Sequence, residues 1–370
     1  MAPNAPRSLL PLVALLFTLL AGCGAPPPAD PIAAAPPSPV SRPAATATAS
    51  PPQRPSPTPA PSATLAPATA TPAPTLALAT ATPDPDAPPR VGLQVGHWKI
   101  EEHPEEQIRL RKFSGAYYGG YDEWELNILI AEEVQRLLEA AGVTVELLPA
   151  TVPVGYQADL FVSIHVDGVT GDQAATRRGW KVATPFGASR ASEALAAAIA
   201  TSYPAATGLP ADPQGPSYDM RAYYAFAAYR YWHSVAPTTP AVIVECGFMT
   251  HPADREVLFE QTERVGTGIA EGILAYLQEY HPADPDMREP RGLAMGRPAA
   301  ADVPLYARAD VSSAVQLTLD RDQPLVQVAR ADGWRLVFTH GDGWELGWLR
   351  ESDVEILDEA IAPPHPCCGE

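Results

Sequence analysis

Residues 160–167 read LFVSIHVD, and this stretch decides the fold. Apolar or small side chains run directly into His165, and Asp167 stands two places later. Such a run indicates a strand buried on both faces, as in the parallel sheets of α/β proteins. A histidine at the end of a buried strand needs a hydrogen-bond partner or a metal, because an unpaired polar group is costly to bury. The stretch therefore predicts both a sheet and a chemical site at its edge.

The flanking sequence alternates between strand-like and helical segments. The segment 123–141 carries apolar residues at helical spacing, and Gly142 follows in the usual stop position. This alternation, with apolar runs for strands, predicts an α/β fold with a twisted, mostly parallel sheet flanked by helices. We expect strands at 90–96, 143–148, 158–165, 179–184 and 241–245, and helices at 123–141, 189–202 and 254–280.

The rest of the chain has a different composition. Residues 301–358 hold short strand-like runs separated by Gly and Asp, which predict a small all-β barrel or sandwich. Residues 24–89 are rich in Pro, Ala and Thr without an aromatic residue, so they cannot bury enough apolar surface to fold. We therefore expect a disordered linker at 24–89, an α/β domain at 90–281, a second linker at 282–300, the β domain and a tail at 359–370.

The charge of the chain restricts its partners. The formal net charge is -18, and the first linker contributes little of it. An acidic surface repels the phosphates of DNA and RNA, so we expect no nucleic-acid partner. The oligomeric state is left open by the sequence, with a monomer as our expectation.

The first 23 residues read MAPNAPRSLLPLVALLFTLLAGC. Arg7 supplies a positive flank, and the apolar core from Leu9 to Leu20 is too short for an ordinary membrane span. The final LAGC resembles the bacterial lipobox, in which the cysteine is acylated. The alternative is a plain secretory signal peptide with a chance cysteine. We expect a lipid on Cys23 that anchors an extracytoplasmic protein of the cell envelope to the membrane.

Four polar residues point to one site. His97, His165 and Glu245 each end an apolar run, and functional groups gather beyond the carboxyl ends of strands in open α/β sheets. Glu123 opens the first helix and could reach the same side, with Glu125 as its rival. Two histidines and a carboxylate suit a catalytic zinc, and a second carboxylate can take the proton of its water. These residue types predict a zinc hydrolase.

Four segments extend this prediction to a family. In chain order they read VGLQVGH, EWELNILIAEEVQRLLEAAGVTVELL, ADLFVSIHVD and PAVIVECGFMTHPADREVL. Together they resemble the zinc-dependent N-acetylmuramoyl-L-alanine amidases of bacterial cell walls, over about residues 91–280. The resemblance implies one Zn²⁺ held by His97, Glu123 and His165, with Glu123 chosen because it stands four places before Asn127. It implies Glu245 as the catalytic residue and peptidoglycan as the partner.

The implied reaction is cleavage of the amide between the lactyl group of N-acetylmuramic acid and L-alanine. The sequence departs from the family at five positions that are neither ligands nor the base, and these departures bear on substrate fit: Gln94, Trp98, Lys99, Asp167 and His251. Two alternative functions are an inactive wall-binding or regulatory homologue and a zinc peptidase of other specificity.

Several further residues have two interpretations each. Asp167 either orients a ligand histidine or caps the following turn. His233 and His251 bind metal or substrate, or have surface and packing roles. Cys246 is interpreted as a small core residue rather than a nucleophile. We assign no role to the adjacent Cys367 and Cys368.

The aromatic stretch MRAYYAFAAYRYW, residues 220–232, is expected to pack, or to line a sugar-binding groove. The segments VPLYARAD, DGWRLVF and DGWELGWLRE resemble bacterial SH3-like domains. The residues that carry this second resemblance are Arg308, Trp334, Trp344 and Trp348. It implies either attachment to the cell wall or a packing module without a ligand.

Overall fold

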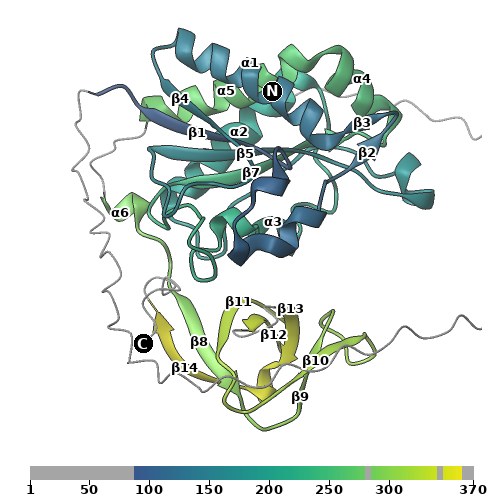
Figure 1. The fold of residues 1–370 in the computed structure, drawn as a ribbon, viewed down its shortest axis with the longest axis vertical. Coiled ribbons are helices and arrows are strands. Elements are labelled where there is room, and N and C mark those ends of the chain that lie inside the picture. The colour runs from purple at the N-terminus through teal and green to yellow at the C-terminus, as the bar shows by residue number, and fades with distance from the viewer. Residues whose placement is uncertain (1–86, 280–284, 340–344, 361–370) are drawn as a thin grey trace, which may run out of the picture. The chain divides into compact units, whose positions relative to one another are not determined.

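The computed structural model describes residues 87–279, 285–339 and 345–360. A five-stranded sheet in the order β4-β1-β5-β7-β6 forms the first part of this structure (Figure 1). Its neighbours pair in parallel except β6, which runs antiparallel to β7. The predicted α/β fold with a mostly parallel sheet is confirmed. The strands are β1 (Arg90–Val95), β4 (Thr144–Leu148), β5 (Leu160–Asp167), β6 (Lys181–Ala183) and β7 (Ala241–Phe248).

The long helices lie together on one face of this sheet (Figure 1). The core beneath them joins alternate residues of β1, such as Leu93, with Ile130, Ile199 and Ile269 of three helices. The opposite face is covered mainly by loops and by the short helix α3 (Tyr218–Arg221), and Phe226 of this covering layer packs against Phe161 of β5. The long helices are α1 (Glu123–Ala140), α2 (Arg190–Thr207) and α5 (Thr262–Glu279).

The predicted single helix at 254–280 is wrong, because the structure has two helices there. The first, α4 (Pro252–Glu260), ends at Gln261, whose backbone has left the helical region with φ -135° and ψ 37°. The Thr262 hydroxyl donates to the Leu258 carbonyl at 2.8 Å, which satisfies one of the carbonyls freed at the break. A local change of backbone thus divides a segment whose apolar periodicity is continuous.

A seven-stranded antiparallel sheet forms the C-terminal part, in the order β10-β9-β13-β12-β11-β8-β14. This all-β part was predicted, and buried apolar residues such as Leu305, Val337 and Leu349 form its core. Strand β8 lies inside the predicted linker 282–300 and pairs with β11 and β14. The strands are β8 (Leu293–Pro298), β9 (Val303–Tyr306), β10 (Val315–Leu319), β11 (Leu325–Ala331), β12 (Trp334–Thr339), β13 (Leu346–Arg350) and β14 (Val354–Ala360).

Several predictions lie outside the described residues: Cys23, almost all of the linker 24–89, Trp344, and the pair Cys367 and Cys368. The domain boundaries and the resemblance to SH3-like domains stay predictions. Among the helices within the described ranges, none combines the length and the apolar character that a membrane crossing requires.

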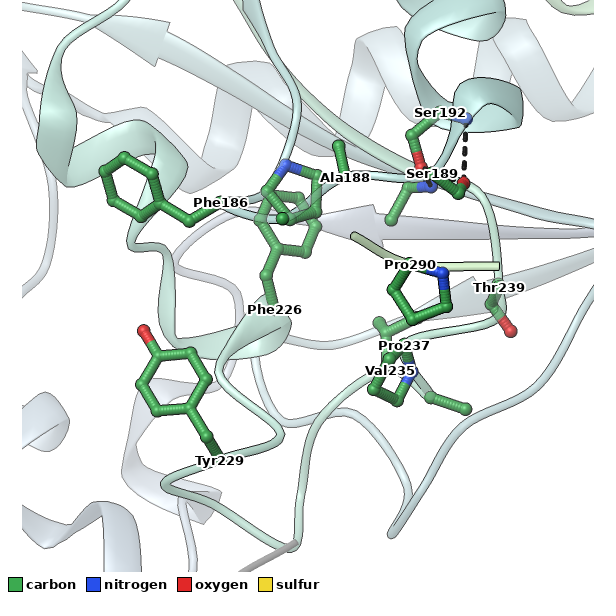
Figure 2. A pocket seen from close by; sticks show the side chains of 14 residues that line it. Phe186, Ala188, Ser189, Ser192, Phe226, Tyr229, Val235, Pro237, Thr239 and Pro290 are labelled. Atoms are coloured by element: carbon green, nitrogen blue, oxygen red, sulfur yellow. Dashed lines mark hydrogen bonds between the residues drawn. The ribbon is translucent and has the colours of Figure 1, made fainter. Parts of the chain in front are cut away.

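A small cavity of about 30 Å³ lies near the start of β7, beside the loop that follows β6 (Figure 2). Phe186, Phe226 and Val235 supply apolar walls, and Ser189 accepts a hydrogen bond from the backbone N–H of Ser192. The volume suits about one water molecule. The cavity is therefore a gap in the packing at the start of β7, whereas Glu245 lies in the second half of that strand.

Candidate active site

Three predicted residues converge at the carboxyl edge of the sheet. His97 follows β1, Glu123 is the first residue of α1, and His165 lies near the end of β5. One ligand atom from each lies within 4.8 Å of the other two. Among the residues that the structure describes, this is the only group of three or more His, Cys, Asp or Glu side chains placed to hold a metal.

The Glu123 carboxylate lies between the two imidazoles. Its Oε1 is 2.9 Å from His165 Nδ1, and its Oε2 is 3.5 Å from His97 Nε2. The backbone N–H groups of Ala116 and Val166 donate to it at 2.8 and 3.2 Å. Asn127 donates to the carboxylate at 3.2 Å and to the Gly96 carbonyl at 3.1 Å. The carboxylate is thus held in one orientation by donors from several segments.

The tautomer of His97 follows from its partner. Its Nδ1 lies 2.7 Å from the carbonyl oxygen of Phe113, and a carbonyl can only accept a hydrogen bond. In the neutral ring Nδ1 therefore carries the proton, and Nε2 presents its lone pair on the side of Glu123. This arrangement is typical of a metal-ligating histidine, whose second nitrogen donates to a backbone carbonyl.

The electrostatics of the group favour the ligand forms of these side chains. Burial would raise the pKa of Glu123, but the charges of His97 and His165 and its hydrogen bonds lower that pKa to about 2. Burial lowers the pKa of His97, and the attraction of Glu123 opposes this only in part. At neutral pH the carboxylate is therefore ionised and the His97 imidazole neutral, which are the forms that bind metal.

Two glycines make room for this close approach. A Cβ on Gly96 would lie 2.3 Å from Cε1 of His165. A Cβ on Gly115 would lie 2.3 Å from Glu123 Oε2 and 2.6 Å from His97 Cδ2. His97 itself adopts the left-handed backbone region, with φ 61°, which a non-glycine residue enters only at a cost. The local backbone is therefore shaped around the three side chains.

Glu245 lies beside this group without belonging to it. It stands in β7, and its Cα pairs with His165 on β5 and with Lys181 on β6. Its Oε2 is buried and has no hydrogen-bond partner among the described residues. Burial raises its pKa well above the usual value, as do the charges of Asp167 and Glu123, while Lys181 opposes them. A carboxyl group with a free oxygen and a raised pKa is suited to proton transfer.

A buried ion pair beside Glu245 was not foreseen from the sequence. Lys181 contacts Asp167 and lies 3.6 Å from Asp212, which Arg177 also binds at 2.7 Å. Asp167 also accepts from the Gly168 N–H at 2.7 Å, so of its two predicted roles the structure favours the turn. The available signal was Lys181 itself, a charged residue within a strand-like stretch, which needs a partner when buried.

A second buried carboxylate, Asp254, was also missed. It accepts from the N–H groups of Gly179 and Phe248 at 2.6 and 3.2 Å and pairs with Arg178 at 3.3 Å. It therefore holds the end of β7 against the segment before β6. No pattern in the sequence marks it, because Arg178 and Gly179 lie far from it along the chain and backbone N–H groups leave no signature.

The remaining candidates lie outside the group of three. Glu125 accepts from the Asp122 N–H at 2.9 Å, which is a helix-capping contact. His233 pairs with Glu106 at 2.8 Å, and His251 lies 3.6 Å from Asp254. Cys246 is buried, and burial raises the pKa of its thiol, which agrees with the predicted core role.

The donor set fits zinc. Two imidazole nitrogens and one carboxylate oxygen form a common three-ligand set of catalytic zinc, which leaves one position for water. Hydrogen bonds from Asn127 to Glu123 and from His97 to Phe113 supply the outer contacts that such sites need. What ion binds there, and the roles of the individual residues, stay predictions.

A family model described as N-acetylmuramoyl-L-alanine amidase matches residues 91–275. Similar solved structures include the amidase AmiC2 of Nostoc punctiforme, with 23% identity, 51% of this chain and 97% of that chain covered, and a TM-score of 0.37. The amidase Ami1 from Mycobacterium smegmatis has 20% identity and a TM-score of 0.40, and the match covers 52% of this chain and 99% of that chain. The CwlD amidase from Clostridioides difficile, solved in complex with the GerS lipoprotein, has 18% identity and a TM-score of 0.36, and the match covers 52% of this chain and 100% of that chain. The comparison with curated proteins finds no match.

The close approach at Gly115 predicts a specific loss of stability. Gly115 and Gly142 have similar backbones, with φ 80° and 85°, but nothing lies within 4 Å of a Cβ built on Gly142. Gly142→Ala should cost about 1–2 kcal/mol for the left-handed backbone. Gly115→Ala should cost about 1–3 kcal/mol more, because its methyl group meets Glu123 and His97. Urea denaturation measures the free energy of unfolding of both variants. Equal losses of stability in the two variants would contradict the crowding at Gly115.

Proposed function

The chain belongs to the N-acetylmuramoyl-L-alanine amidase family, and we propose that it performs its hydrolysis with zinc-activated water. It is a peptidoglycan hydrolase, which cleaves the amide between the lactyl group of N-acetylmuramic acid and L-alanine. The observation that carries the zinc proposal is the group of His97, Glu123 and His165, whose ligand atoms lie within 4.8 Å of one another.

The three ligand residues have distinct tasks in this proposal. His97 and His165 each contribute a ring nitrogen, and Glu123 contributes a carboxylate that is ionised at neutral pH because its pKa is lowered to about 2. Zinc held by these residues would supply a Lewis acid that polarises the substrate carbonyl and lowers the pKa of a bound water towards about 7. The outer contacts of Asn127 and Phe113 keep the ligands in position as the substrate changes.

Glu245 transfers the protons. It accepts a proton from the attacking water, whose oxygen bonds to the lactyl carbonyl carbon. The bond from that carbon to the nitrogen of L-alanine then breaks, and Glu245 returns the proton to the departing amine. A raised pKa suits both steps, because the group must hold a proton and release it near neutral pH. The unpartnered Oε2 of Glu245 supports this assignment.

Two substitutions separate the proposed base from the proposed ligands. Glu245→Ala should reduce peptide release from purified cell walls by roughly 10²–10⁴-fold while leaving the zinc content unchanged. His165→Ala should lose both zinc and activity, since it removes a ligand. Mass spectrometry identifies the product as stem peptides with a free L-alanine amino group, and elemental analysis measures the zinc.

Glu125→Ala is the matched control, because its carboxylate caps α1 outside the ligand group. Turnover that survives Glu245→Ala would refute the assigned base. A wild-type chain that binds zinc without releasing peptide would favour the wall-binding or regulatory homologue. Cleavage within the stem peptide would favour a zinc peptidase.

The pH dependence should respond to Asp167. Burial and the charge of Asp167 raise the pKa of Glu245, and an acting base must be ionised, so activity falls as the pH drops through that raised pKa. Asp167→Asn removes one raising charge and leaves the opposing Lys181 in place. The acid limb of the kcat/KM profile should therefore move to lower pH. Asp172→Asn, at an exposed position, is the control, and a limb that stays in place would exclude this coupling.

We also propose that Cys23 carries a lipid and holds the enzyme in the cell envelope. The support is the sequence LAGC after a short apolar core and the Pro-rich residues 24–89 that follow. An extracytoplasmic position agrees with a peptidoglycan substrate. Labelled palmitate should be incorporated into the wild-type protein and not into Cys23→Ala. Equal labelling of the two proteins would contradict the anchor.

A further inference from the structure

The imidazole of His165 has a second partner besides Glu123. Its Nε2 lies 3.0 Å from the hydroxyl oxygen of Tyr223. The Tyr223 hydroxyl donates to the Tyr224 hydroxyl at 3.1 Å, and that hydroxyl donates to the Ala150 carbonyl at 2.8 Å. The ring of Tyr223 also meets the His165 ring edge-on, with centroids 5.2 Å apart. A short chain of hydroxyls thus joins a predicted metal ligand to the backbone.

The direction of this chain is set at its far end. A carbonyl oxygen only accepts, so the Tyr224 hydroxyl donates its single hydrogen to the Ala150 carbonyl. The Tyr224 oxygen then accepts the proton of Tyr223, and Gln94 approaches the same oxygen with a donor nitrogen at 3.4 Å. Tyr223 has no proton left for His165. Its oxygen must therefore accept from His165, and Nε2 of His165 carries the hydrogen.

We propose that Tyr223, supported by Tyr224, is a positioning residue that keeps His165 in the tautomer able to bind a metal through Nδ1. With the hydrogen held on Nε2, Nδ1 would offer its lone pair to a metal on the side of Glu123, where the ligand atoms gather, in place of the hydrogen bond that it makes to Glu123 without one. The proposal rests on the zinc site proposed above. It assigns a role to two tyrosines of the stretch 220–232, for which packing or sugar binding was expected.

The competing arrangement explains why such a residue is needed. If the hydrogen moved to Nδ1, that nitrogen would donate to Glu123 Oε1, only 2.9 Å away. In this hydrogen bond Nδ1 would have no lone pair for a metal, and one lone pair of Glu123 Oε1 would be occupied. Both effects would oppose metal binding. His97 avoids the equivalent problem because Phe113 takes the hydrogen of its Nδ1. For His165 the hydroxyl of Tyr223 takes the hydrogen of Nε2, the other ring nitrogen, and leaves Nδ1 for the metal.

Tyr223→Phe in the full-length chain tests this role, because it keeps the ring and removes only the hydroxyl. Zinc affinity, measured by competition with a chelator, should fall by about 10–100-fold, as for the loss of other outer contacts to ligand histidines. The visible absorption bands of the cobalt-substituted protein should shift, since the geometry of one ligand changes. Tyr224→Phe should weaken zinc binding in the same direction and by less.

Tyr156→Phe is the matched control. It removes another hydroxyl from a buried tyrosine, one that donates to Glu146 at 3.0 Å on the β4 edge of the sheet. It should leave the zinc affinity and the cobalt bands unchanged. The proposal is overturned if Tyr223→Phe binds zinc as the wild type does or more tightly, or if Tyr156→Phe weakens binding equally. A wild-type chain without zinc affinity would instead overturn the proposed function.

Discussion

The site depends on one buried carboxylate, Glu123, placed between two imidazoles. An ionised group with only 4% of its surface exposed must be compensated by donors and positive charge. Backbone N–H groups and Asn127 donate to it and the two imidazoles lie against it, and these groups come from the segment before α1, from α1 itself, from the turn after β1 and from the end of β5. The start of α1, the turn after β1 and the end of β5 are therefore held together by the requirements of a single side chain. The crowding at Gly96 and Gly115 is a consequence of the same requirement.

Two glutamates near one another acquire opposite properties from their surroundings. Glu123, surrounded by donors and imidazoles, has a pKa lowered to about 2, whereas burial and negative neighbours raise the pKa of Glu245. Such a separation is how enzymes divide the tasks of two carboxyl groups. In the ion pair beside Glu245, Asp167 adds to this difference and Lys181 opposes it. The proposed ligand and the proposed proton carrier are thus distinguished by environment and not by residue type.

The layering of the fold explains what surrounds the site. The long helices cover one face of the sheet, while loops and short helices cover the other (Figure 1). Tyr223 and Tyr224 belong to this second layer, and the hydroxyl of Tyr223 reaches His165 near the end of β5. The second nitrogen of each histidine is consequently met by a different kind of acceptor. For His97 it is the Phe113 carbonyl, and for His165 it is a tyrosine hydroxyl. The contacts that orient the proposed ligands therefore come from the loop after β1 and the loop after α3.

The fold class, most strands and helices, and the four polar residues proposed for the site could be predicted from the sequence alone. Those features follow from local apolar runs and from the residues that end them. The sequence did not reveal the break at Gln261, the partners of Lys181 and Asp254, or the tyrosine chain. A backbone change at one residue leaves the apolar periodicity intact, and contacts between separate segments of the chain leave no local pattern. Only tertiary packing decided which oxygen faces which nitrogen, because that depends on distances set by the whole sheet.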